Sequence, residues 1–231
     1  MASDFSSLMR LIQFTDSTFP VGTFSFSNGL ETASYEKLVH DAGTLEQFTR
    51  SAAVQAAFSD GVTAHIAYNS VKKDDYELLL KADEHLMLFK MNDEARLMLQ
   101  RMGKKLAELL VRLYPDSEIA AKWLGDINDG KTPGTYPASQ GVAFAIAGMS
   151  AEELFCSHQY GVINMILSAA LRCVRVSHYD TQKILFRLTE ESEALYEDVK
   201  NMSFEDMNAF VPEMDIMASL HEKGNMRMFM N

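Results

Sequence analysis

Basic side chains are scarce in this sequence. Its 231 residues include 21 lysines and arginines against 32 aspartates and glutamates, which gives a formal net charge of −11. A surface that binds nucleic acid needs clustered positive charge to meet the phosphates, and the sequence has no such cluster. The composition therefore excludes nucleic acid as a partner and favours basic protein surfaces or cations.

Cysteine is scarce too, and so are signal-peptide features in the opening stretch. Cys156 and Cys173 are the two cysteines, too few for a disulfide framework, so a reducing compartment is expected. The opening stretch MASDFSSLMR has neither the basic nor the apolar region of a signal peptide. Both features predict a cytoplasmic protein.

Formal charge is absent from the whole run between Leu154 and Leu171. The run is close to the length of a membrane span. It contains His158, Gln159 and Asn164, however, and charged residues flank it on both sides. This composition favours a central helix that is buried in the protein, and no association with a membrane is expected.

Glycine and proline are few, at 12 and 5, and no segment alternates convincingly as a strand does. Apolar residues recur instead at helical spacing, most clearly from Ala95 to Leu113, just before Pro115. The pattern predicts an all-α protein, a single globular domain of about ten packed helices over residues 1–231. The expected helices span residues 4–14, 28–38, 45–59, 61–73, 75–91, 93–113, 117–127, 138–148, 151–176 and 181–200, with a short one near 204–209.

One motif of nucleotide-binding proteins occurs, because Gly125–Thr132 matches G-x-x-x-x-G-K-[ST]. A phosphate-binding loop follows a strand and opens a helix. Here the preceding residues read as helix, and Pro133 prevents a helix from starting at Thr132. We interpret the match as coincidence, and a nucleotide hydrolase that uses Lys131 and Thr132 is a remote alternative.

Recognisable catalytic and metal-ligating patterns are also lacking. The six histidines never occur four residues apart, and no glutamate precedes a histidine by three residues. The sequence therefore lacks the paired ligands of helical zinc and di-iron sites. No nucleophile elbow and no family-type cysteine–histidine signature occurs. We predict that the protein is not an enzyme and binds no cofactor tightly.

Two segments remain that chemistry does not explain. The first, residues 19–31, is an apolar loop rich in aromatic and hydroxyl side chains, and we call it the signature loop. It is either an internal plug or the roof of a small-ligand pocket beneath Phe19, Phe24 and Phe26. The second is the methionine-rich tail, residues 212–231. It either repacks on a partner protein or docks as a terminal helix on its own core.

At these segments the sequence resembles the UreF family of urease accessory proteins. The signature loop is similar to the family pattern L-P-V-G-G-F-S-Y-S-x-G-L-E, with Thr23 where a second glycine is usual. Further similarities follow in order along the chain. Glu94–Arg96 with Met102–Gly103 resembles E-x-R…M-G, and Gly134–Gly141 resembles G-H-x-P-x-x-x-G with Thr135 in place of the histidine. Ser168–Arg172 with Asp180–Gln182 resembles S-A-A-V-R…D-G-Q, and the tail residues Asp215–Ile216, His221–Glu222 and Arg227–Phe229 resemble D-I…H-E…R-L-F. Arg175–His178 replaces the usual P-L-G-Q.

The resemblance implies an all-helical chaperone subunit that forms a homodimer and binds a UreD/UreH-type accessory protein. That platform recruits the UreG GTPase and apo-urease, and nickel is delivered when GTP is hydrolysed. Nickel is then handled by the complex. The implied site residues are Arg172, Asp180 and Gln182 for GTPase recruitment; Met214, Asp215, Ile216, His221, Glu222, Arg227, Met228 and Phe229 of the partner-dependent tail; and Pro20, Val21, Gly22, Phe24, Ser25, Ser27, Gly29 and Glu31 of the signature loop.

Overall fold

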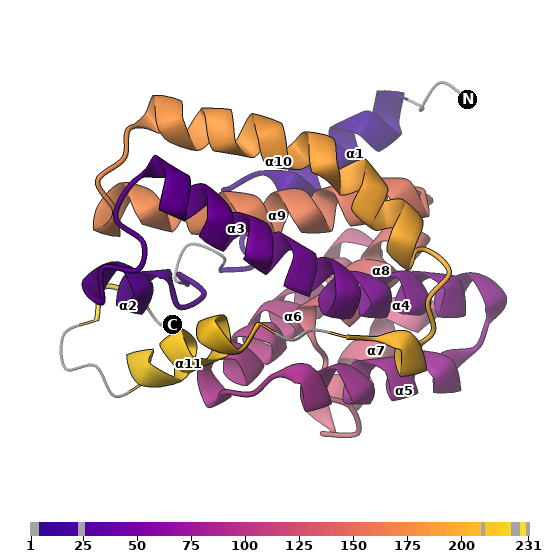
Figure 1. Cartoon of the computed structure of the whole chain (residues 1–231). Coiled ribbons are helices and arrows are strands. Elements are labelled where there is room, and N and C mark those ends of the chain that lie inside the picture. Colours follow the sequence, from indigo (N-terminus) through magenta and orange to yellow (C-terminus); the bar gives the residue numbers. More distant parts are fainter. Residues whose placement is uncertain (1–4, 23–25, 209–210, 223–226, 230–231) are drawn as a thin grey trace.

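A computed structural model describes residues 5–22, 26–208, 211–222 and 227–229, and within these ranges the chain is helical and has no strand (Figure 1). The α-helices are α1 (Phe5–Thr15), α2 (Leu30–Tyr35), α3 (Ala42–Ala56), α4 (Val62–Lys73), α5 (Tyr76–Leu86), α6 (Asp93–Leu113), α7 (Glu118–Asn128), α8 (Tyr136–Ile146), α9 (Ala151–Cys173), α10 (His178–Val199) and α11 (Pro212–His221). Shorter turns are the π-helical η2 (Ala57–Gly61) and the 3₁₀ helices η3 (Met87–Phe89) and η4 (Phe204–Asp206). The all-α prediction is confirmed.

Helix α8 forms the centre of one half of the molecule. It carries no charge, and its residues from Pro137 to Ala145 are all buried between α4 and α6. Glycines make this close packing possible. A Cβ atom on Gly141 would lie 2.5 Å from the Ala64 carbonyl oxygen of α4, and one on Gly103 of α6 would overlap the Gly134 carbonyl.

Helix α9 is the axis of the other half, where it packs against α3 and α10 (Figure 1). In the described part of the chain it is the one helix long and apolar enough to cross a membrane. More than half of its most apolar stretch, 56%, is buried inside the molecule, as expected for a core helix. The prediction of a buried central helix therefore fits its position.

Several helix boundaries differ from the prediction for identifiable reasons. Residues 45–73 were expected to break near residue 60, but the π-turn η2 carries the chain continuously from α3 into α4. Helix α8 begins before its predicted start because Pro137 occupies the first turn, where a proline costs no hydrogen bond. Helix α2 is short because Gly29 precedes it at φ +79° and Lys37 follows it at φ +60°.

The tail contains a helix, α11, that packs against α2 and α6. Its residues Met214, Ala218 and His221 are buried, and so is Phe229 beyond its end. The described residues of the tail therefore dock on the chain's own core, which is one of the two interpretations given above. Dependence of residues 212–231 on a partner remains a prediction.

Candidate functional site

The signature loop is mostly buried where the structure describes it. Val21, Phe26 and Ser27 are buried, whereas Pro20 and Gly22 are exposed; Phe24 and Ser25 lie outside the described residues. The loop is kept in place by local backbone bonds, such as the one from the Leu30 N–H to the Ser27 carbonyl, 3.1 Å. It therefore packs as an internal element of the fold.

Gly29 brings the signature loop against the tail. Its φ of +79° belongs to the left-handed region that glycine tolerates. A Cβ atom there would lie 3.1 Å from the backbone nitrogen of Ala218 and 3.3 Å from the carbonyl of Met214. Helix α11 thus rests directly on this glycine, and any side chain would push the helix away.

The next motif residue, Glu31, joins a group that we call the tail clamp: Glu31, Glu94, His221 and Arg227. The His221 ring lies between the two carboxylates, with Nε2 2.9 Å from Glu31 and Nδ1 2.9 Å from Glu94. Arg227 donates to the other Glu94 oxygen. Glu31 also accepts from the backbone N–H groups of Met228 at 2.8 Å and Phe229 at 3.1 Å. The clamp therefore ties the end of the tail to α2 and α6.

The charges in the clamp balance when the His221 ring carries two protons. Each nitrogen of His221 faces a carboxylate oxygen, so both hydrogen bonds form only when both nitrogens carry a proton. The imidazolium and Arg227 then neutralise Glu31 and Glu94. Burial by itself would raise the pKa of Glu31, but the hydrogen bonds from His221 and from the Met228 and Phe229 N–H groups outweigh it and lower that pKa.

Glu222, beside His221, makes a separate contact between tail and core. Its Oε1 accepts from the backbone N–H groups of Asp93 at 3.0 Å and Glu94 at 3.2 Å, the free amides at the start of α6. Asn92 caps the same helix through Ala95. The paired His–Glu motif of the tail thus places one side chain in the clamp and the other on a helix terminus.

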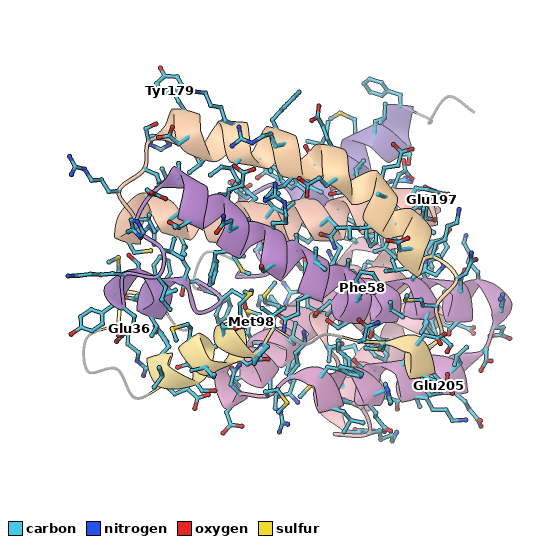
Figure 2. All side chains as sticks on the ribbon, in the orientation of Figure 1. Glu36, Phe58, Met98, Tyr179, Glu197 and Glu205 are labelled. Atoms are coloured by element: carbon cyan, nitrogen blue, oxygen red, sulfur yellow. The ribbon has the colours of Figure 1, made fainter. Side chains whose placement is uncertain are left out.

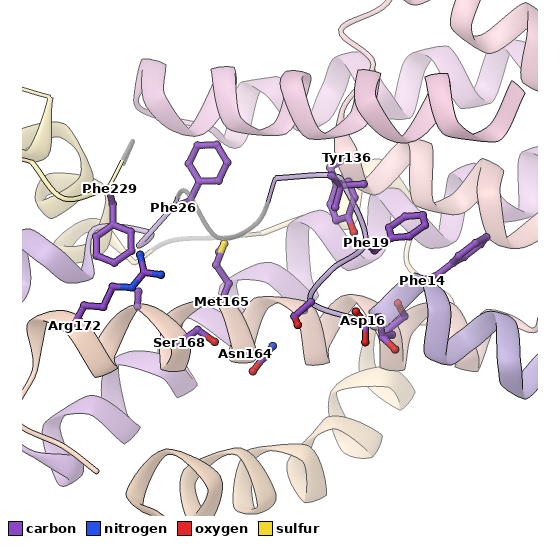
Figure 3. A pocket seen from close by; sticks show the side chains of 16 residues that line it. Phe14, Asp16, Phe19, Phe26, Tyr136, Asn164, Met165, Ser168, Arg172 and Phe229 are labelled. Carbon is purple, nitrogen blue, oxygen red and sulfur yellow. The ribbon is translucent and has the colours of Figure 1, made fainter. Parts of the chain in front are cut away.

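A cavity of about 50 Å³ lies beneath the signature loop (Figure 3). Phe26, Phe229 and Arg172 line one end, where the Arg172 guanidinium carbon lies 5.5 Å from the centre of the Phe229 ring, and Phe14 and Phe19 line the other. A pocket under the loop was one sequence-based alternative. Its volume holds roughly four water-sized spheres, which is small for an organic substrate.

The three residues implied in GTPase recruitment do not form one group. Arg172 contacts the tail through Phe229. Asp180 caps the start of α10 through the Ser177 N–H and hydroxyl, and these hydrogen bonds lower its pKa. Gln182 is exposed in a groove beside Tyr179, which points away from the molecule (Figure 2). Asp180 and Gln182 therefore line neither the cavity nor the clamp.

The tail residues fall on two faces. Met214, His221 and Phe229 face the core, and Asp215 and Glu222 are half-buried. Ile216 and Met228 are 52% and 58% exposed, and Leu220 and Arg227 are exposed too. An apolar outer face thus remains after the tail has docked on its own chain.

The apparent nucleotide motif has the wrong structure for phosphate binding. Residues 118–128 form α7, which includes Gly125, so the motif begins inside a helix and not after a strand. Lys131 is paired with Asp126 and Asp129, and the Thr132 hydroxyl donates to the buried Asp83. Among the residues that the structure describes, no group of three or more His, Cys, Asp or Glu side chains is placed to hold a metal ion.

Sequence patterns did not predict the clamp or the contact of Glu222 with α6. The clamp glutamates and histidine each occur in a different motif, at Glu31, Glu94 and His221. The one available signal was that these motifs pair acidic residues in two of them with basic residues in the third, which could have suggested an ion pair between them. Spacing along the chain gave none, because Glu31 and His221 are 190 residues apart.

The described residues are those of an all-helical protein. Its motif residues connect a mostly buried loop, the start of a helix and the chain's own tail. The family model for UreF matches residues 39–189. Urease accessory protein UreF 2 of Brucella canis is 46% identical over 97% of this chain and 92% of its own length. Urease accessory protein UreF of Yersinia pestis, strain Pestoides F, is 42% identical over 98% of this chain and 99% of its own. The chain belongs to the UreF family of urease accessory proteins.

Proposed function

We propose that this chain is a scaffold subunit of urease maturation that binds a UreD/UreH-type protein and recruits the UreG GTPase and apo-urease. Nickel is the cargo of the assembled complex, released to urease as GTP is hydrolysed, and this subunit retains no metal. The observation that carries the proposal is the tail clamp. In a chain of this family, the charged residues of three motifs are placed to hold a docking segment.

The outer face of the tail is the proposed contact with the UreD/UreH-type protein. Ile216, Leu220 and Met228 are exposed there, while the opposite face of the tail packs on the core. Apolar side chains that remain exposed beside a polar rim are typical of protein–protein interfaces. Methionine suits such a surface because its flexible side chain adapts to the partner.

Arg172 is the first candidate for GTPase recruitment, followed by Asp180 and Gln182. Arg172 is supported by its position, because its contact with Phe229 links its orientation to the docking of the tail. A partner that grips the tail would therefore also influence Arg172. Such coupling of binding free energies allows a subunit without chemistry of its own to favour one state of a GTPase.

Helix α1 supplies the proposed homodimer contact. Phe5, Leu8, Met9 and Ile12 follow helical spacing along one face, and each is exposed. Arg10 is the one charged residue of α1, in a chain of net charge −11. This face is therefore a place where two acidic copies can approach without opposing carboxylates.

Co-purification with the UreD/UreH-type protein tests the proposed function. The double variant Ile216→Asp with Met228→Asp is expected to weaken the complex at least tenfold, since charges would enter an apolar interface. Its melting temperature should match that of the native chain because both side chains are exposed. Leu113→Asp, at the opposite end of α6, is the matched control and should bind normally.

Undiminished binding by the double variant would contradict the proposal. Deletion of residues 212–231 is a less informative test. It removes Met214, His221 and Phe229 from the core, so a loss of binding could follow from a loss of folding.

A further inference from the structure

A second cavity, of about 100 Å³, lies among α3, α6, α9 and α11. It shares Tyr136, Gly161 and Met165 with the wall of the first cavity. Most of its wall is apolar, and methionines from three helices contribute to it: Met98 and Met102 of α6, Met165 of α9 and Met214 of α11. We call it the methionine cavity. Its volume corresponds to roughly seven to ten water-sized spheres.

One buried polar atom on this wall has no partner in the described part of the protein. His158 is 96% buried, and its Nε2 forms no hydrogen bond, whereas its Nδ1 lies 2.8 Å from the side-chain oxygen of Gln140. The Gln140 nitrogen donates in turn to the Tyr136 hydroxyl, at 3.2 Å. With the Gln140 nitrogen donating to Tyr136, the Gln140 oxygen accepts the proton on Nδ1 of His158, and burial lowers the pKa of His158. Nε2 is therefore an acceptor without a donor.

The other polar groups on the wall have less need of a ligand. Asp60 is paired with Lys90 and accepts from the Ser59 hydroxyl. Asn92 accepts from the Ala95 N–H. Gln55 and Asp215 are half-buried, so water reaches them. A ligand that fits this wall offers one hydrogen-bond donor and an apolar body.

We propose that the methionine cavity binds a small neutral aromatic molecule that donates one hydroxyl or ring N–H to His158 Nε2. An unpartnered buried acceptor costs free energy, and a matching donor removes that cost. Methionine sulfur makes favourable contacts with aromatic rings. A ring with one polar substituent, about seven non-hydrogen atoms, is the upper limit of size, since an apolar cavity of about 150 Å³ binds benzene. The site is independent of the proposed role in urease maturation.

Phenol and toluene are the probes, because they have the same size and differ in the donor. Binding to the full chain is followed by NMR of ¹³C-labelled methionine methyl groups. Phenol should shift the signals of Met102, Met165 and Met214 but not that of Met9, exposed on α1. It should bind about threefold to tenfold more tightly than toluene, the ratio expected for one net hydrogen bond.

Two variants locate the ligand. Gly161→Leu should abolish binding of both probes, since a Cβ atom at Gly161 meets no atom within 4 Å and a leucine can grow into the space. Gly161→Ala is its matched control and should retain binding. His158→Leu should retain toluene but lose the preference for phenol. If His158→Leu does not fold, the comparison of phenol and toluene binding to the native and Gly161→Leu proteins still tests the proposal.

Three results would overturn the proposal. Equal or weaker binding of phenol than toluene would show that Nε2 does not act as an acceptor. Binding that persists in Gly161→Leu would place the ligand elsewhere. Absence of binding by both probes at millimolar concentration would mean that the cavity holds water only.

Discussion

His221 is the residue at which the signature loop, helix α6 and the tail meet. Its side chain is 2% exposed and bridges two carboxylates that belong to different motifs. Both glutamates are half-buried, and the His221 ring lies between their carboxylates and binds each of them. The histidine thus ties the tail to the core.

Replacement of His221 by leucine should lower the free energy of unfolding by about 1–3 kcal/mol, because it leaves two half-buried carboxylates without their shared partner. Arg227→Gln is the matched comparison. The Arg227 side chain is 38% exposed, so its loss should cost less than about 1 kcal/mol. Urea denaturation of both variants measures the difference. Equal costs would show that the clamp does not depend on the buried histidine.

The lowered pKa of Glu31 makes the clamp sensitive to acid. Its ordinary value is 4.5, so the stability gained from ionised Glu31 is complete above pH 4.5 and is lost as the pH falls through the lowered folded-state value. The native chain should exceed Glu31→Gln in stability at neutral pH, and this excess should shrink below pH 4.5. Urea midpoints from pH 7 to pH 3.5 measure it. An excess that stays constant over this range would contradict the assignment.

At the scale of elements, glycines of the UreF-type motifs lie where helices pack closely against each other. Gly103 and Gly141 lie where α6 and α4 approach α8, and Gly134 has φ +67° in the loop before α8. Asp83 fixes that loop by accepting from the Gly134 and Thr135 N–H groups at 2.7 Å and 2.9 Å. Helical periodicity predicted these helices to within a few residues. It could not show which of their faces would meet.

Two glycine-to-alanine variants separate close packing from helix propensity. In Gly141→Ala the new methyl group would meet backbone atoms of α4, which cannot move aside, and about 1–3 kcal/mol of stability should be lost. In Gly125→Ala of α7 the methyl group meets no atom within 4 Å, and stability should rise by about 0.5–1 kcal/mol. Thermal unfolding of the pair checks both signs. A stabilised Gly141→Ala would contradict the packing described.

At the scale of the whole molecule, residues distant in sequence form the site. The fold class followed from the apolar spacing alone, because each helix records its own period locally. The site did not, because Glu31, Glu94 and His221 are brought together by tertiary packing. The signature loop and the tail were nevertheless identified as segments in need of burial, and the structure packs their described parts against each other.

The stability of the proposed homodimer depends on two opposing contributions. The apolar contact at α1 favours it, and the electrostatic repulsion between two chains of net charge −11 opposes it. Raising salt from 10 mM to 150 mM shortens the screening length from about 30 Å to about 8 Å. The repulsion then fades while the apolar contact remains, so the dimer should tighten by about threefold to tenfold, as sedimentation would measure. Met9→Asp should remain monomeric at both concentrations. A dimer that loosens with salt would instead depend on ion pairs, and α1 would not be its interface.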